Sequence, residues 1–230
     1  MKNVFLSLLL FVVISCKSQP DTSLAINADR FEKGINDSGI QVLDVRTAGE
    51  YGSGHIKKAL LADWTNKKEF NDRIQYVDKD KPVYIYCLAG GRSAAAADWM
   101  RKNGFQNVIE LQGGMNAWKA ATKPIEGSSN EKQMTVDEYW TKIPADSTVL
   151  VDFGATWCPP CVKMEPVLAE IQKDKSLHFQ FIKIDAGLHT DVMKALSIEP
   201  IPVFIIYKNG KEQWRKEGIV SIEELKTHLQ

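Results

Sequence analysis

The sequence predicts two consecutive α/β domains, and three observations carry this prediction. The chain has 230 residues, a length that suits two domains of about 100 residues each. Apolar segments with the composition of strands alternate with helical segments, an order typical of parallel sheets. Between two such series lies a stretch that contains Pro124, Gly127 and Asn130, which predicts a linker over residues 123–133.

The overall charge excludes some classes of partner. Lys and Arg together number 29, as do Asp and Glu, so the formal net charge is zero. A protein that binds nucleic acid would show a basic stripe or a basic domain, so no nucleic-acid partner is expected. Because a neutral chain produces little long-range field, any selectivity for anions must come from local groups.

The first 15 residues predict a signal peptide. Lys2 precedes an almost continuous apolar stretch, residues 4–14, and then come Ser15 and Cys16. This order is typical of secretory signals, and the stretch is shorter than the roughly 20 residues that span a bilayer. Residues 13–16 also resemble a bacterial lipoprotein signal, which implies lipidation of Cys16 and an exported protein anchored on the periplasmic side of a membrane. The alternatives are an ordinary signal peptide cut near Cys16 and an uncleaved anchor.

The cysteines favour reactive thiols over structural disulfides. There are four, at positions 16, 87, 158 and 161. If Cys16 is lipidated, one lone cysteine and one closely spaced pair are left, whereas a disulfide framework shows an even set at dispersed spacings. A zinc site is not expected, because no second Cys-x-x-Cys and no suitably spaced Cys–His pair exists.

The first predicted domain, residues 22–122, alternates strands and helices. Its strands are short and rich in β-branched and aromatic residues. A run of alanines predicts one of its helices, and Gly104 lies just beyond the end of that helix. The predicted elements are a helical stretch before residue 36, strands at 40–45, 82–87 and 108–111, and helices at 93–102 and 115–121.

Cys87 ends a predicted strand and begins a loop that can hold an anion. Gly90 and Gly91 let the backbone curl so that successive N–H groups point inward, and Ser93 begins the next helix. Such a nest at a helix start binds anions and lowers the pKa of a cysteine within it. Arg92 adds positive charge. The nest can hold a persulfide or bind thiosulfate, and the alternative is a packed core thiol.

The segment from Cys87 to Ser93 resembles the active-site loop of rhodaneses, and the resemblance spans about residues 24–121. It includes Asp44, Arg46, Glu50 and His55, which we interpret as structural, and the segment Leu111-Gln112-Gly113-Gly114 followed by Trp118. The resemblance implies a sulfurtransferase in which Cys87 carries a persulfide received from a small sulfane-sulfur donor such as thiosulfate.

Loop length separates two chemistries in this family. Four residues lie between Cys87 and Arg92, which is the shorter loop associated with sulfur transfer. Rhodanese-like phosphatases have one residue more. We therefore expect sulfur rather than phosphate chemistry, and the alternative is a catalytically weak domain that serves for binding.

The second predicted domain, residues 134–230, begins with a capping box at Thr135 and Glu138. Asn209-Gly210 predicts a tight hairpin, and Pro166 should kink the helix that contains it. The predicted elements are a first helix from residue 135, strands at 148–153, 179–184, 203–207 and 211–215, and helices at 158–173, 191–196 and from 221 onward.

Cys158 and Cys161 lie where a strand gives way to a helix. Unpaired N–H groups and the helix dipole lower the pKa of a cysteine at such a position, and Pro159 and Pro160 fit the first turn. We expect Cys158 to be the exposed nucleophile. Cys161 is then the buried resolving thiol, acting through a mixed disulfide.

Residues 151–161 resemble the active-site segment of thioredoxins, and the resemblance covers about residues 134–230. It implies a mixed sheet flanked by helices, a redox-active Cys158–Cys161 disulfide, and no other cofactor. Asp152 matches the buried carboxylate that assists Cys161, and Trp157 matches the aromatic residue beside the nucleophile. Ile201 and Pro202 match the cis-proline loop that pairs with a substrate chain; Pro200 could compete for that role.

Two departures from the thioredoxin pattern leave the direction of electron flow open. Pro159-Pro160 replaces Gly-Pro, and Gly154 stands where thioredoxins often have Trp. Expected partners are protein disulfides or a membrane redox partner. Three hypotheses follow for the whole chain: a relay in which Cys158 takes sulfur from Cys87, two independent activities, or a disulfide reductase with a non-catalytic first domain.

Overall fold

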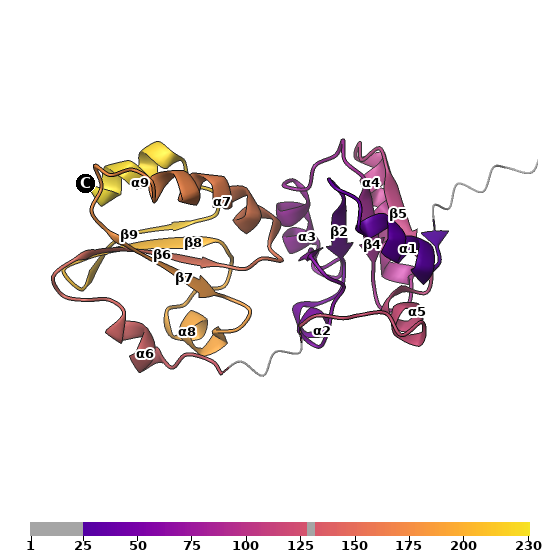
Figure 1. Cartoon of the computed structure of the whole chain (residues 1–230), viewed down its shortest axis with the longest axis horizontal. Coiled ribbons are helices and arrows are strands. Elements are labelled where there is room, and N and C mark those ends of the chain that lie inside the picture. The colour runs from indigo at the N-terminus through magenta and orange to yellow at the C-terminus, as the bar shows by residue number, and fades with distance from the viewer. Residues whose placement is uncertain (1–24, 128–131) are drawn as a thin grey trace, which may run out of the picture.

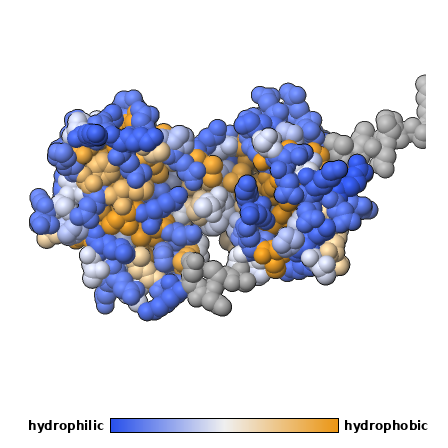
Figure 2. Space-filling view, viewed as in Figure 1, coloured by the Kyte–Doolittle hydropathy of each residue, from blue (hydrophilic) through white to orange (hydrophobic). Residues whose placement is uncertain are grey.

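A computed structural model describes residues 25–127 and 132–230, which form two lobes with one sheet in each (Figure 1). The predicted signal peptide, residues 1–15, and Cys16 lie outside the described residues. Within the described part, no helix has the length and apolar character needed to cross a membrane. Figure 2 shows hydrophilic residues around the rims of both lobes, and hydrophobic residues in the middle of the near face of the second lobe and on the side of the first lobe that faces it.

The first lobe contains a sheet of five parallel strands in the order β1-β5-β4-β2-β3. Parallel strands bring their carboxyl ends to one edge of a sheet, so the loop after β4, which begins with Cys87, lies at that edge. The strands are β1 (Ala25–Ile26), β2 (Gln41–Asp44), β3 (Ala59–Leu61), β4 (Val83–Tyr86) and β5 (Val108–Leu111).

Five helices cover the sheet of the first lobe, and two clusters of buried side chains form its core. One cluster includes Phe70 from α3 and Met100 from α4, and the other includes Phe31 from α1 and Trp118 from α5. The helices are α1 (Ala28–Ile35), α2 (Ala48–Gly52), α3 (Lys67–Ile74), α4 (Gly91–Lys102) and α5 (Gly114–Ala120). The sequence pattern did not predict β1, α2, β3 or α3.

A buried ion pair braces the carboxyl end of β2. The guanidinium of Arg46 donates to the carboxylate of Asp44 at 2.6 and 3.0 Å and to the carbonyl oxygen of Gly54 at 2.8 Å. Both side chains are almost fully buried. A buried charge needs this degree of pairing to be tolerated, which agrees with the structural role expected for both residues.

The predicted linker begins as a segment bound to the first lobe. The Lys123 ammonium contacts the carboxylates of Asp29 and Glu32, both at 2.7 Å. The backbones of Glu126 and His55 exchange two hydrogen bonds of 2.8 Å. At the other end, the Met134 N–H donates to His189 of the second lobe at 3.0 Å. Residues 123–127 are thus packed against the first lobe, while the second lobe begins its contacts near residue 133.

The second lobe contains a mixed sheet in the order β7-β6-β8-β9. Strand β6 pairs in parallel with β7 and antiparallel with β8, which forms a hairpin with β9. The element order agrees with the prediction, and α7 continues through Pro166. The elements are α6 (Val136–Thr141), β6 (Thr148–Gly154), α7 (Pro159–Ile171), β7 (Gln180–Asp185), α8 (Thr190–Ala195), β8 (Val203–Lys208), β9 (Lys211–Glu217) and α9 (Ile222–Leu229).

Candidate functional site

The loop after β4 surrounds the sulfur of Cys87 with hydrogen-bond donors. The N–H of Gly90 donates to the Sγ of Cys87 at 3.1 Å, and the Ser93 hydroxyl lies 3.5 Å from the same sulfur. Gly90 has a φ of 105°, a conformation that favours glycine. Gly91 has no such backbone requirement, and a side chain there would enter open space. The curl predicted for two glycines is therefore made by Gly90 alone.

The hydrogen bonds to Cys87 decide its ionisation. Burial alone would raise the pKa of this thiol, which is 1% exposed. Hydrogen bonds from the Ser93 hydroxyl and from the backbone of Ser93, Ala89 and Gly90 outweigh the burial, and the pKa lies below its ordinary value. The sequence-based expectation of a nest that favours the thiolate agrees with this direction.

Arg92 pairs with a carboxylate beside the Cys87 loop. Its guanidinium donates to both carboxylate oxygens of Glu50, at 2.6 and 2.7 Å. This pairing lowers the pKa of Glu50 to about 2 and raises that of Arg92. The pair ties the Cys87 loop to α2, and Arg92 also interacts electrostatically with Cys87. The groups that lower the pKa of Cys87 are N–H and O–H donors.

The start of α5 supports the Cys87 loop from behind. The N–H of Met115 donates to the carbonyl oxygen of Cys87 at 2.8 Å, and that of Asn116 donates to the carbonyl oxygen of Leu88 at 3.0 Å. Gly114 makes this approach possible, because a side chain at that position would clash with the Cys87 carbonyl oxygen. The segment Gly113-Gly114 therefore fixes the loop through close backbone contact.

In the second lobe, Cys158 and Cys161 form a disulfide at the start of α7. Cys158 is the N-cap residue, and the N–H of Cys161 donates to its Sγ at 3.3 Å. The Ile201–Pro202 peptide bond is cis, which assigns the predicted role to Pro202 rather than Pro200. The Sγ of Cys158 lies 3.7 Å from the carbonyl oxygen of Ile201.

Asp152 lies behind the disulfide in the interior of the second lobe. Burial raises its pKa to about 6, a shift that nearby Lys183 opposes and Glu165 reinforces. A side chain added at Gly154 would lie 3.1 Å from the Oδ1 of Asp152 and 3.6 Å from the Sγ of Cys161. Glycine at position 154 therefore keeps side-chain atoms away from the carboxylate and the resolving sulfur.

Trp157, next to the disulfide, docks onto the first lobe. Its carbonyl oxygen accepts a hydrogen bond of 2.7 Å from the N–H of Leu61 on the edge strand β3. Its ring lies 5.9 Å from that of Tyr51, and the Arg73 guanidinium lies 5.1 Å from the ring centre. Arg73 also donates to the Leu61 carbonyl oxygen at 3.1 Å. The contact satisfies an exposed sheet edge, which otherwise invites pairing with another chain.

The two cysteines differ in exposure from the prediction, because both are buried. Cys158 has 0% exposed surface, whereas Cys161 is 8% exposed. The sequence predicted an exposed Cys158 from its position at the start of a helix. In the whole chain the first lobe holds Trp157, and Ala155 and Ile201 pack around the disulfide, so the nucleophile is covered.

The structure does not bring Cys87 and Cys158 together. Leu61, Asp44 and Tyr86 are in register across the neighbouring strands β3, β2 and β4, so two strand spacings, about 10 Å, separate Leu61 from Tyr86. Cys87 follows Tyr86, and Trp157 lies outside β3.

Within the described chain, no group of three or more His, Cys, Asp or Glu residues is placed to hold a metal ion.

The covering of Cys158 predicts slow alkylation of this thiol in the reduced protein. Arg73→Ala removes the hydrogen bond to Leu61 and the cation from the Trp157 ring, so the rate of Cys158 alkylation by iodoacetamide should rise several-fold. Mass spectrometry of the labelled peptide measures that rate. Arg215→Ala is the matched control, since Arg215 also binds a carbonyl oxygen and a glutamate but lies in β9. Equal rates in the Arg73→Ala variant and the unaltered chain would contradict the covering.

Comparisons with known proteins agree with the two sites. A family model described as a rhodanese-like domain matches residues 27–121, and one described as thioredoxin matches residues 130–230. A thiosulfate sulfurtransferase, GlpE of Pseudomonas fluorescens, is 35% identical over 99 residues, which are 43% of this chain and 87% of the relative. A thioredoxin-like protein of Synechocystis, slr0233, is 34% identical over 82 residues, 36% of this chain and 78% of the relative.

Chloroplast thioredoxins match the second half of the chain. Thioredoxin Y of Oryza sativa subsp. japonica is 42% identical over 81 residues, which are 35% of this chain and 48% of the relative. The chain thus spans about half the length of the chloroplast thioredoxins that it matches. The chain belongs to two families at once: a rhodanese-like domain over residues 27–121 is followed by a thioredoxin domain over residues 130–230.

Proposed function

We propose that the protein is an exported thiol–disulfide oxidoreductase with a linked sulfurtransferase domain. One observation carries the proposal: in each domain a backbone N–H at a strand-to-helix junction donates to a cysteine sulfur. The donors are Gly90 for Cys87 and Cys161 for Cys158. Donors that favour a sulfur anion make the cysteine a nucleophile at neutral pH.

Sulfur transfer begins at Cys87. Its thiolate attacks the outer sulfur of thiosulfate, a new S–S bond forms, and sulfite leaves with the electron pair of the broken bond. The product is a persulfide anion on Cys87. The N–H groups that hold the thiolate, together with the Ser93 hydroxyl, are placed to stabilise the persulfide.

The reduced thioredoxin domain then removes the outer sulfur. The Cys158 thiolate attacks that sulfur and releases Cys87 as a thiolate, which leaves a persulfide on Cys158. Cys161 attacks the inner sulfur, so that hydrosulfide leaves and the Cys158–Cys161 disulfide forms. Electrons for the next cycle must come from an external dithiol, such as a membrane redox partner.

The separation of the two cysteines constrains this relay. With Trp157 docked on β3, strands β2 and β3 lie between Cys158 and Tyr86, the residue before Cys87. Direct transfer within one chain therefore requires the thioredoxin domain to leave this position. Transfer from Cys87 of one molecule to Cys158 of another also requires the thioredoxin domain to leave its docked position.

A second candidate keeps the rhodanese-like domain as a binding module. The observation that favours it is the docking of Trp157 on Leu61, Tyr51 and Arg73, which gives that domain a role without sulfur chemistry. In this case the thioredoxin domain reduces protein disulfides independently. An ordinary thiol pKa at Cys87 and no sulfur transfer from thiosulfate would favour this candidate.

Export and lipid anchoring are part of the proposal and rest on the sequence. The apolar stretch at residues 4–14 and the following Cys16 support a lipoprotein signal that places the protein on the periplasmic side of a membrane. A compartment where disulfides form and persist suits a chain whose folded domains carry reactive cysteines.

The relay predicts that sulfide release depends on Cys158. The chain is reduced, freed of excess dithiol, loaded with thiosulfate at Cys87, and followed through one turnover by a sulfide assay. Cys158→Ser should abolish release above background, and Cys161→Ser should accumulate a persulfide on Cys158 that mass spectrometry detects. Unchanged sulfide release from the Cys158→Ser protein would contradict the relay. Disulfide reduction on an insulin-type substrate that survives Cys87→Ser would show that the thioredoxin domain also works alone.

The raised pKa of Asp152 predicts a pH-dependent resolving step. Above about pH 6 the carboxylate is ionised and can accept the Cys161 proton, and below that pH it cannot. Release of a chromogenic thiol from a mixed disulfide on Cys158, measured in single turnovers, should slow as the pH falls through about 6. In Asp152→Asn this step should be slow at pH 7 and should lose that inflection.

A stability measurement provides the control for Asp152. Because its folded pKa is raised, the ionised form costs stability, and this cost is present above about pH 6 and absent below the unfolded pKa of about 4. Asp152→Asn should therefore raise the free energy of unfolding by up to about 3 kcal/mol at pH 8 and leave it unchanged at pH 3. Asp146→Asn changes an exposed aspartate of the same domain and should leave the free energy of unfolding unchanged at both pH values. A pH-independent effect of Asp152→Asn would contradict the assignment.

A further inference from the structure

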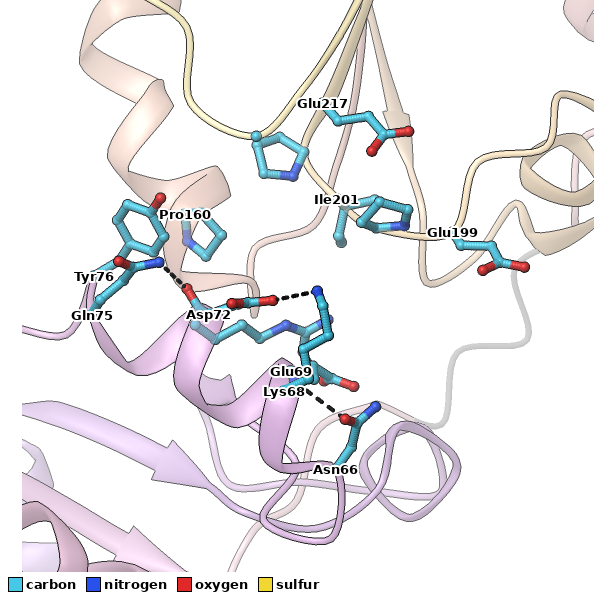
Figure 3. Close-up of a pocket in the computed structure, with 14 residues that line it drawn as sticks. Asn66, Lys68, Glu69, Asp72, Gln75, Tyr76, Pro160, Glu199, Ile201 and Glu217 are labelled. Atoms are coloured by element: carbon cyan, nitrogen blue, oxygen red, sulfur yellow. Dashed lines mark hydrogen bonds and ion pairs between the residues drawn. The ribbon is translucent and has the colours of Figure 1, made fainter.

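A groove of about 620 Å³ lies between the two domains beside the disulfide. One wall is α3 of the rhodanese-like domain, and the other is made by Pro160 and the loop of Ile201 and Pro202 (Figure 3). The volume falls within the range of about 300–1,000 Å³ that is usual for ligand sites. Neither domain alone contains this groove.

Neither Cys158 nor Cys161 lines the groove, but its thioredoxin wall lies against the disulfide and offers backbone groups. The carbonyl oxygen of Ile201 lies 3.7 Å from the Sγ of Cys158. Among the described residues the N–H of Ile201 has no hydrogen-bond partner. An unpaired backbone donor at the end of a strand can pair with an extended peptide. The groove therefore fits an extended chain that passes close to the disulfide.

The charges of the two walls differ. On α3, Lys68 pairs with Asp72 at 2.8 Å and Arg73 pairs with Glu69 at 2.9 Å, so this wall is neutral. Across the groove, Glu199 and Glu217 are exposed and form no ion pair with any residue that the structure describes. Figure 3 shows both glutamates on the thioredoxin side of the groove. The groove thus has an excess of negative charge next to a site of sulfur exchange.

We infer that the groove selects among the protein substrates of the disulfide site and favours an extended segment with a Lys or Arg beside its cysteine. The inference rests on the proposed disulfide exchange and specifies its substrate class. Glu199 and Glu217 attract the cationic residue, the Ile201 backbone pairs with the chain, and α3 forms the second wall. The rhodanese-like domain thereby sets the specificity of a reaction that occurs in the other domain.

The experiment compares two disulfide-bonded peptides that are identical except for Arg or Glu beside the cysteine. Reduction by the whole reduced chain gives KM and kcat for each. We expect the Arg peptide to have a KM several-fold lower at low salt, with the difference shrinking as salt screens the charges. Glu199→Gln with Glu217→Gln should raise KM for the Arg peptide by roughly two- to fivefold per charge and leave kcat unchanged.

Variants in α3 test the contribution of the second wall, because they lie outside the thioredoxin domain. Asp72→Asn frees the charge of Lys68 and should raise KM for the Arg peptide, whereas Lys68→Gln frees the charge of Asp72 and should lower it. Glu170→Gln, at the far end of α7, and Lys102→Gln, in α4, change exposed charges away from the groove. Neither control should alter KM.

A small uncharged disulfide reagent separates the possible failures. If the chain reduces the reagent but treats both peptides alike, or if the α3 variants leave KM unchanged, the groove is not the substrate site and the proposed function stands. In that case the groove does not distinguish peptide substrates by their charge. If neither reagent nor peptide is reduced, the proposed disulfide exchange itself is overturned, and the inference fails with it.

Discussion

The chemistry of this chain depends on backbone N–H groups that point at sulfur where a strand gives way to a helix. Gly90 donates to Cys87 at 3.1 Å and Cys161 donates to Cys158 at 3.3 Å. Amides fixed in a helix start need no reorganisation when a sulfur anion forms, which is why they favour it. At Cys87 these donors outweigh the burial that would otherwise keep the thiol neutral. The fold supplies this arrangement twice, on a parallel sheet and on a mixed sheet.

The contact between the domains decides which sulfur is available. Trp157 joins the active-site loop of one domain to the edge strand of the other through its backbone and its ring. This contact holds Trp157, which packs against the disulfide, keeps Cys158 away from Cys87, and creates the groove beside Pro202. The rhodanese-like domain therefore carries its own sulfur site, and it also contacts the active-site loop of the thioredoxin domain. Nothing about either domain in isolation would show this dependence.

The sequence predicted most of what is local. The order of elements in the thioredoxin domain, the nest at Cys87 and the cis bond before Pro202 follow from patterns within short segments, and the structure agrees with them. The sequence did not predict the pairing of Glu50 with Arg92 or the burial of Cys158. Both features depend on contacts between residues more than 40 positions apart in the chain. Helix α3, with a polar sequence and only two buried residues, lacked a strong apolar pattern, although it forms one wall of the groove.

The ionisation of the two nucleophiles tests the central claim most directly. Thiolate absorbance of the reduced chain, followed with pH in Cys87→Ser and Cys158→Ser proteins, separates the two titrations. Both Cys87 and Cys158 should ionise below the value of about 8.5 that a free cysteine shows. Titration of both sulfurs at or above that value would mean that the amides do not hold sulfur as an anion.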